Sequence, residues 1–351
     1  NQMPDKVDFV PLLVQLVVCP DQALRLEACC CLANIAGHSI RARKNILSTP
    51  SAVENLLLNI VPGTPQPILS RALCALVNLC RQLPGPYDVA MRPAIRDFVT
   101  IAGAVYRPSP EPMSFKEEEV ELARYSLWGL AFLTELESDG REWVLESRAA
   151  VATLVGLLEH PDFDIITPAL RTLGNLVSGV GMETTEVINA GALPIIGDLL
   201  VHQSCFIRKE ACWLLSNVAA GYTFEVQQLF EARSKRSQNL LIDDVIACRS
   251  NNKLHNVQKE AYFVVATIMT SENAVKVRPL LLNRDPHLSM LRDAAITCKN
   301  VDDLVHIVCT AFDEVMRTHP DFQPAEGTSQ ALLNTAVCTG DKAGDRKKNP
   351  K

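Results

Sequence analysis

Six segments of this sequence repeat one pattern of small, apolar and polar residues, and this repetition is the feature that most limits the possible folds. Each segment has a small residue, a Leu or Val four residues later, and an Asn, Phe or Thr two residues after that. With this last residue as position zero, successive segments lie 44, 54, 43, 42 and 50 residues apart. Such spacing is typical of helical repeats that stack into one continuous core. The residues at position zero are Asn34, Asn78, Phe132, Asn175, Asn217 and Thr267.

Positions −6, −2 and +1 of each segment fall on one narrow face of a helix, at about 100° per residue. They are small at −6 and aliphatic at −2 and +1, so we expect this face to be the core stripe, with the small residue allowing a close approach between helices. The set is Ala28, Leu32, Ile35, Ala72, Leu76, Leu79, Ser126, Leu130, Leu133, Ala169, Leu173, Leu176, Ala211, Leu215, Val218, Ala261, Val265 and Ile268.

Positions −4 and zero fall on nearly the opposite face. A single Asn near a helix end is usually a cap or a solvated group, but four Asn in the same phase favour a binding role. Trp and Arg are also unusual on a face that has no function. The pairs are Cys30 and Asn34, Cys74 and Asn78, Trp128 and Phe132, Arg171 and Asn175, Trp213 and Asn217, and Phe263 and Thr267.

Shorter apolar segments precede these helices, as at 9–16, 151–158 and 191–200, and they predict a second helix in each repeat. In the last of them, Gly191 is suited to end one helix and Pro194 to the first turn of the next. Hydrophobic residues make up 48% of the chain but aromatic residues only 5%, which favours helices over a β-sandwich. The chain is therefore predicted to be all-α.

Two of the intervals are long because they contain insertions. The first insertion, near 83–112, is rich in proline, although its middle, 89–105, is compatible with a helix. The second insertion, near 230–257, carries the basic cluster Arg233-Ser-Lys-Arg236. An amphipathic helix is expected at 301–317, and a disordered tail at 321–351.

The net charge of −6, from 40 acidic and 34 basic residues, disfavours nucleic acid as a partner. No apolar run approaches the ~20 residues that span a bilayer, so no membrane partner is expected. The cysteines, three of them consecutive at 29–31, suit neither a disulfide framework nor a metal site, and we interpret most as buried, reduced thiols. No cofactor is indicated. Because the sequence starts at Asn1 without Met, we expect it to be a fragment.

The repeats resemble those of the importin-α family of nuclear-import adaptors. The stretch 167–179, TPALRTLGNLVSG, is similar to the sixth repeat of that family, and 207–221, IRKEACWLLSNVAAG, is similar to the seventh. The resemblance is looser elsewhere and extends over roughly 5–318. It implies an all-α armadillo-repeat solenoid, a right-handed superhelix, over 1–320 in about seven repeats.

The resemblance also implies a function. In this family, Trp and Asn residues one turn apart line a concave groove that binds the basic nuclear-localisation signals of other proteins. The implied location is the cytoplasm and the nucleus. Importin-β is a further candidate partner, through a basic N-terminal segment that the sequence lacks. The peptide-binding residues implied are Asn34, Asn78, Trp128, Arg171, Asn175, Glu210, Trp213, Asn217, Glu260 and Phe263.

The sequence departs from the family pattern at several positions in its first half. Cys30 and Cys74 stand where the family has Trp, and His38 stands where it has the Asp that captures a key lysine. Basic residues follow at Arg41, Arg43 and Lys44, and they would repel a basic peptide. In the second half, Phe263 replaces a Trp and Thr267 replaces an Asn.

Two hypotheses remain open, and a third has no support. The chain is either an import adaptor for basic signals, acting mainly around 171–260, or a divergent scaffold or chaperone for one dedicated protein partner. An enzyme is not indicated, because the sequence has no phosphate-binding glycine loop, no G-x-S-x-G and no H-E-x-x-H.

Overall fold

The computed structural model describes residues 8–82, 89–106, 116–135, 139–147, 149–179, 182–248, 255–285, 288–297, 302–318 and 327. In these parts of the chain the regular elements are helices. One isolated β-bridge pairs Arg233 with Leu240. The all-α prediction is thus confirmed. The chain divides into two compact units, Asn1–Leu176 and Val177–Lys351.

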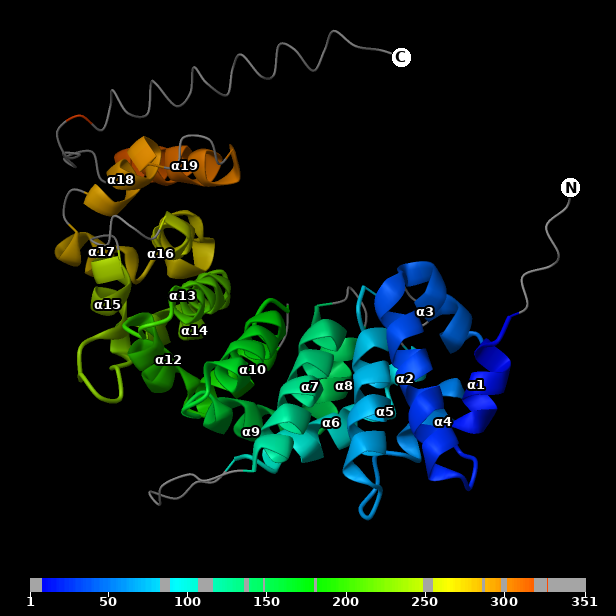
Figure 1. The fold of residues 1–351 in the computed structure, drawn as a ribbon. Coiled ribbons are helices and arrows are strands. Elements are labelled where there is room, and N and C mark those ends of the chain that lie inside the picture. Colours follow the sequence, from blue (N-terminus) through cyan, green and yellow to red (C-terminus); the bar gives the residue numbers. More distant parts are fainter. Residues whose placement is uncertain are drawn as a thin grey trace, which may run out of the picture. The chain divides into compact units, whose positions relative to one another are not determined.

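Four long helices of the first unit carry the repeated segments, and consecutive ones pack against each other (Figure 1). They are α2 (Gln22–His38), α5 (Gln66–Leu79), α7 (Glu117–Thr134) and α10 (Phe163–Leu176). Shorter helices pack beside them, as the segments at 9–16 and 151–158 predict. These are α1 (Val10–Leu16), α3 (Ile40–Leu47), α4 (Ala52–Leu57), α6 (Ala94–Gly103), α8 (Gly140–Glu146) and α9 (Ala150–Leu157).

The second unit repeats the arrangement around three long helices. They are α13 (Cys205–Ala219), α16 (His255–Thr270) and α19 (Asp302–Thr318), with α16 packed against both of the others. The last of these confirms the amphipathic helix expected at 301–317. The shorter helices are α11 (Glu183–Asn189), α12 (Ala192–Leu200), α14 (Thr223–Glu231), α15 (Leu241–Ala247), α17 (Arg278–Arg284) and α18 (Ser289–Thr297).

The predicted core stripe forms the core of both units. In the six long helices that carry the repeated segment, the residues at positions −6, −2 and +1 are buried, except Ile35, which is half-buried. Burial of each aliphatic side chain of this set contributes about 1.5–3 kcal/mol to folding. The helical period of the sequence pattern therefore fixes which face of each long helix is buried.

The ends of the helices follow from local chemistry. Asp21 caps α2, because its Oδ1 accepts hydrogen bonds from the backbone N–H groups of Ala23 at 2.8 Å and Leu24 at 3.1 Å. Gly191 lies between α11 and α12 with φ +84°, a left-handed conformation that suits glycine, and Pro194 lies in the first turn of α12. Both roles were predicted from the sequence.

The insertions add local structure to their units. In the first insertion, 89–105 contains a 3-10 turn at Val89–Met91 and then α6, while 83–88 and 107–112 lie outside the described residues. In the second, the basic cluster docks on α12. The backbone N–H of Lys235 donates to the carbonyl of Pro194 at 2.9 Å, and that of Arg236 donates to Asp198 Oδ1 at 2.9 Å. The tail expected at 321–351 lies outside the described residues, apart from residue 327.

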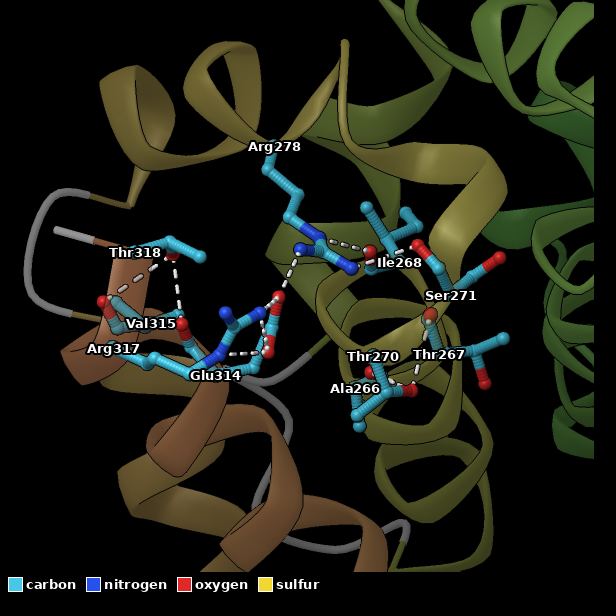
Figure 2. A network of polar contacts seen from close by, with 10 residues as sticks. All are labelled: Ala266, Thr267, Ile268, Thr270, Ser271, Arg278, Glu314, Val315, Arg317 and Thr318. Carbon is cyan, nitrogen blue, oxygen red and sulfur yellow. Dashed lines mark hydrogen bonds and ion pairs between the residues drawn. The ribbon is translucent and has the colours of Figure 1, made fainter.

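A buried arginine joins three helices at the end of the second unit (Figure 2). Arg278 of α17 donates to the backbone carbonyl of Ser271, just after α16, at 2.8 Å. It also donates to Glu314 Oε1 of α19 at 2.8 Å, and the same carboxylate accepts from Arg317. Arg278 therefore satisfies a carbonyl at the end of α16 and connects it to α19.

Candidate peptide-binding surface

The predicted binding positions form a partly exposed stripe on the long helices, which we call the ladder face. Side chains at these positions are exposed or half-buried, with the exception of Asn175, which is buried. The ladder face therefore lies opposite the core stripe, as the sequence pattern predicts. It consists of Cys30, Asn34, Cys74, Asn78, Trp128, Phe132, Arg171, Asn175, Trp213, Asn217, Phe263 and Thr267.

Two asparagines of the ladder face also tie neighbouring repeats together. Asn78 Nδ2 donates to the carbonyl oxygen of Ala33 in α2 at 3.0 Å. Asn175 Nδ2 donates to the carbonyl oxygen of Ala131 in α7 at 3.0 Å and to Thr134 Oγ1 at 3.1 Å. Each backbone acceptor is the residue just before position zero of the preceding long helix. The sequence pattern predicts a binding role for these amides but does not indicate this structural one.

An open pocket of about 300 Å³ lies between the ladder faces of α5 and α7. It brings together two predicted site residues, Asn78 and Trp128. The rings of Trp128 and Phe132 stack with their centroids 5.7 Å apart. The guanidinium of Arg81, which follows α5, lies over the Phe132 ring at 5.7 Å from its centroid. The lining residues are Cys74, Val77, Asn78, Arg81, Tyr125, Trp128 and Phe132.

Arg81 and Tyr125 line the pocket and lie outside the set of binding residues predicted from the sequence. Tyr125 lies one turn before Trp128 on α7, and Arg81 lies three residues after Asn78. Both fall on the helical phase of the ladder face, so an extension of the pattern to positions −7 and +3 would have found them. Cys74 is half-buried, and burial is the main cause that raises the pKa of its thiol.

Basic residues surround the N-terminal part of the ladder face. His38 and Arg41 are exposed at the junction of α2 and α3, and Asn34 is exposed on α2. Arg43 is buried and donates from Nη1 to the carbonyl of Ala36 at 3.0 Å. Burial and then the charge of Arg81 lower the pKa of Arg43, so these two cations lie within electrostatic range. This region offers a basic peptide repulsion rather than attraction.

The remaining predicted residue of the first unit is Arg171, which is half-buried on α10. Two turns earlier on α10, Asp164 forms an ion pair with α7, in which Arg124 Nη1 lies 3.6 Å from Asp164 Oδ2. Arg171 and Asn175 thus belong to the first unit, whereas the other residues predicted around 171–260 belong to the second.

The second unit carries the other half of the predicted set. Trp213 and Asn217 are half-buried one turn apart on α13, and Phe263 is half-buried on α16, which packs along α13. Glu260 is half-buried one turn before Phe263. Trp213 and Phe263 occupy the same repeat position on two adjoining helices.

Local cations already accompany two of these groups. Glu210 is 4% exposed, and its Oε1 lies 3.4 Å from Lys209 Nζ. Lys259 Nζ lies over the Phe263 ring, 5.8 Å from its centroid. A bound lysine would therefore compete with Lys259 for the Phe263 ring.

The described residues show neither a metal site nor a membrane span. They contain no group of three or more His, Cys, Asp or Glu side chains placed to hold a metal ion. None of the described helices is long and apolar enough to cross a membrane.

Comparison with known proteins identifies the repeats. The Armadillo/beta-catenin-like repeat family matches residues 143–178 and 184–220. These segments include α10 and α13, two of the helices with the predicted pattern.

Curated relatives include three plant importins. Importin subunit alpha-8 of Arabidopsis thaliana is 34% identical over 210 residues, which cover 59% of this chain and 43% of that protein. Importin subunit alpha-1b of Oryza sativa subsp. japonica is 31% identical over 205 residues, which cover 58% of this chain and 36% of that protein. Importin subunit alpha-1a of the same organism is 32% identical over 224 residues, covering 64% and 40%. The matches thus span less than half the length of these relatives.

Solved structures share the fold. A designed armadillo repeat protein in complex with the peptide (KR)4 matches with a TM-score of 0.63 and 21% identity, covering 74% of this chain and 99% of that one. A crystal structure of an engineered protein matches with a TM-score of 0.62 and 23% identity, covering 74% and 98%. With its repeats, its fold and its relatives in agreement, this chain is an armadillo-repeat protein that is similar to importin α subunits over part of their length.

Proposed function

We propose that the chain is an adaptor for nuclear protein import and binds a basic nuclear-localisation-signal peptide on the ladder face of α13 and α16. The observation that carries this proposal is the pair Trp213 and Asn217, partly exposed one turn apart on α13. On α16, Phe263 extends the same face. The importin-α relatives support the role of import adaptor, with the cytoplasm and the nucleus as its locations.

The chemistry of this face suits an extended basic peptide. An extended backbone has unpaired N–H and C=O groups, and a side-chain amide such as that of Asn217 has both a donor and an acceptor for them. The indole of Trp213 offers an apolar wall and a π face to the stem and head of a lysine. The carboxylate of Glu260 adds negative charge to the same surface. Of the similar solved proteins, one designed armadillo protein is in complex with a basic peptide, (KR)4.

The second candidate is a scaffold or chaperone for one dedicated protein partner. Specific observations in the first unit favour it. Cys30 and Cys74 leave α2 and α5 without indoles on the ladder face, and Arg41 and Arg81 add positive charge there. A basic signal peptide therefore has fewer favourable contacts in this unit. Importin-β, as a further partner, belongs to the adaptor proposal and not to this second candidate.

A binding titration tests the adaptor proposal. The change in fluorescence anisotropy of a labelled bipartite basic signal peptide is measured with the unmodified chain, Trp213→Ala and Phe224→Ala. Phe224 is an exposed aromatic residue on α14 of the same unit, and it serves as the matched control. We expect Trp213→Ala to weaken binding about tenfold, because it removes both a cation–π contact and apolar wall.

The outcomes separate the two candidates. Binding that weakens with salt and with Trp213→Ala, but not with Phe224→Ala, supports the adaptor. Absence of binding by a chain that circular dichroism shows to be helical and folded would overturn the adaptor proposal and leave the dedicated-partner scaffold.

A further inference from the structure

The pocket between α5 and α7 has the size of a site for one large side chain. Its volume of about 300 Å³ lies at the lower end of the range for ligand pockets. Three of its seven lining residues are aromatic, namely Tyr125, Trp128 and Phe132. The pocket is open because position −4 of α5 is Cys74, a residue much smaller than the Trp at the same position of α7. An apolar side chain would bury its surface against these rings.

The charge at this pocket opposes a lysine. Arg81 is the one charged residue among the seven that line it, and its guanidinium already covers the Phe132 ring face. Arg71, exposed on α5, lies close enough to influence the titration of both Cys74 and Tyr125. Glu121 acts on the same two groups from α7, and Arg124 also acts on Tyr125. With Arg81, three guanidinium groups thus accompany one carboxylate. The local balance is positive, and the buried Arg43 adds to it.

The pocket also offers a hydrogen-bond acceptor to a bound backbone. Asn78 Nδ2 is held by the carbonyl of Ala33, which fixes the orientation of the amide. Asn78 Oδ1 accepts no hydrogen bond from the described residues, and it belongs to a lining residue. An extended segment that crosses the pocket can therefore donate one backbone N–H to Asn78 Oδ1.

We infer that this pocket is an anchor site for an extended peptide that presents a bulky apolar side chain next to a carboxylate. The side chain lies against Trp128 and Phe132, the carboxylate pairs with Arg81, and a backbone N–H binds Asn78. The inference rests on the proposed function in one respect, which is that the ladder face binds extended peptide. It differs in assigning to the first unit a partner segment whose charge is opposite to that of the basic signal proposed for the second unit.

Cys74 allows a direct test by disulfide tethering. The full chain is equilibrated with two mixed disulfides that release the same small thiol, one carrying the dipeptide Phe-Glu and the other Phe-Lys. Labelling at Cys74 is measured by peptide mapping at increasing concentrations of β-mercaptoethanol. Cys31, an exposed thiol on α2, is the internal control in the same sample. Because the tether is covalent, the comparison detects preferences that are too weak for a titration.

The inference predicts a specific set of preferences. The disulfide between Cys74 and the Phe-Glu reagent persists up to a β-mercaptoethanol concentration about threefold to fivefold higher than the disulfide with the Phe-Lys reagent. This ratio corresponds to the free energy of one partly exposed ion pair. Arg81→Glu reverses this preference, and Arg81→Gln abolishes it. Cys31 shows no preference in any variant.

Other results overturn the inference. Equal labelling at Cys74, or a preference for Phe-Lys, contradicts the charge assignment. A preference for Phe-Glu that survives Arg81→Glu contradicts the role of Arg81. The result is independent of the adaptor test, since Trp213→Ala is expected to leave the Cys74 preference unchanged. A chain that fails to bind the basic signal and still prefers Phe-Glu at Cys74 retains the anchor site while the adaptor proposal fails.

Discussion

The side-chain amide of Asn78 donates from Nδ2 to the carbonyl oxygen of Ala33 at 3.0 Å and so joins two successive long helices. Asn175 makes the equivalent hydrogen bond to Ala131, also at 3.0 Å. An asparagine at position zero is therefore part of the packing between repeats, as well as a candidate contact for a peptide. Because of this dual role, a substitution at this position can change stability as well as binding, and the two effects have to be measured separately.

Replacing these asparagines should destabilise the first unit to different degrees. Asn78→Ala removes one partly buried hydrogen bond and should lower the free energy of unfolding by about 1 kcal/mol. Asn175→Ala removes two buried hydrogen bonds and leaves Thr134 Oγ1 without its donor, so we expect about 2–3 kcal/mol. Urea denaturation followed by circular dichroism measures both values.

Asn34→Ala is the control for these two substitutions. Asn34 occupies position zero of α2 and is exposed, and its replacement should change stability by less than about 0.5 kcal/mol. Equal effects of all three substitutions would show that the hydrogen bonds between repeats do not determine the stability of the unit.

The buried faces were predictable from the sequence because they depend on the helical period alone. A residue at −6, −2 or +1 points to the core whatever its neighbours are. Of the residues at these three positions in the six repeat helices, Ile35 alone is half-buried and the others are buried. The helical period likewise predicts the partial exposure of Trp128 and Trp213 on the ladder face. Local signals, such as Gly191 with its positive φ, also suffice for a helix end.

Features that depend on two helices at once were not predictable from one repeat. Asn175 is buried because Ala131 and Thr134 of α7 lie beside it, and a pattern within α10 carries no information on that contact. The pocket exists because the side chain of Cys74 is small and because Arg81 folds over a ring of the next helix. Distances across helices decide both features.

Cys248 should be the most reactive of the partly buried thiols. A hydrogen bond from Cys212 and the charge of Arg208 lower the pKa of Cys248, although burial opposes them. Burial raises the pKa of Cys29 to about 12, and it also raises the pKa of Cys309. Because the thiolate is the nucleophile, Cys248 should react with iodoacetamide near neutral pH well before Cys309.

The measurement for this prediction is time-resolved alkylation with peptide mapping. Arg208→Gln should slow the labelling of Cys248 severalfold, since it removes a charge that favours the thiolate, and should leave Cys309 unchanged. Labelling of Cys248 at the rate of Cys309 in the unmodified chain would contradict the assignment.

The ion pair between Arg278 and Glu314 should make the second unit sensitive to acid (Figure 2). The hydrogen bond from Arg317, and then that from Arg278, hold the pKa of Glu314 below its usual value of 4.5, and desolvation opposes them. A carboxyl whose pKa is lowered by folding stabilises the fold above its unfolded pKa. That stabilisation is lost as the pH falls through the lower folded pKa.

Thermal unfolding measured across this pH range tests the acid sensitivity. Glu314→Gln should lower the unfolding temperature of the second unit at neutral pH and flatten its decline below about pH 4.5, the usual pKa of the group. Arg278→Met should destabilise more than Arg317→Met, because the Arg278 side chain is 4% exposed and that of Arg317 is 72% exposed. An unchanged acid response in Glu314→Gln would exclude this carboxylate as the titrating group.

Restoring the family residues in the first unit should create a site for basic peptide. The combined substitution Cys30→Trp, Cys74→Trp and His38→Asp adds two indole walls and one carboxylate to the ladder face of α2 and α5. Each replaced side chain is exposed or half-buried, so the helices can accommodate the change at their surface. We expect the affinity for a labelled basic signal peptide to rise about tenfold, through cation–π contacts and one ion pair.

The rise should persist in a Trp213→Ala background, because the new contacts lie in the first unit. The control combines the same two Trp substitutions with an unchanged His38, and it should gain less affinity, since it lacks the carboxylate. Unchanged affinity in the triple variant, with helicity and melting temperature preserved, would show that Arg81 and Arg41 repel basic peptide strongly enough to offset the restored groups.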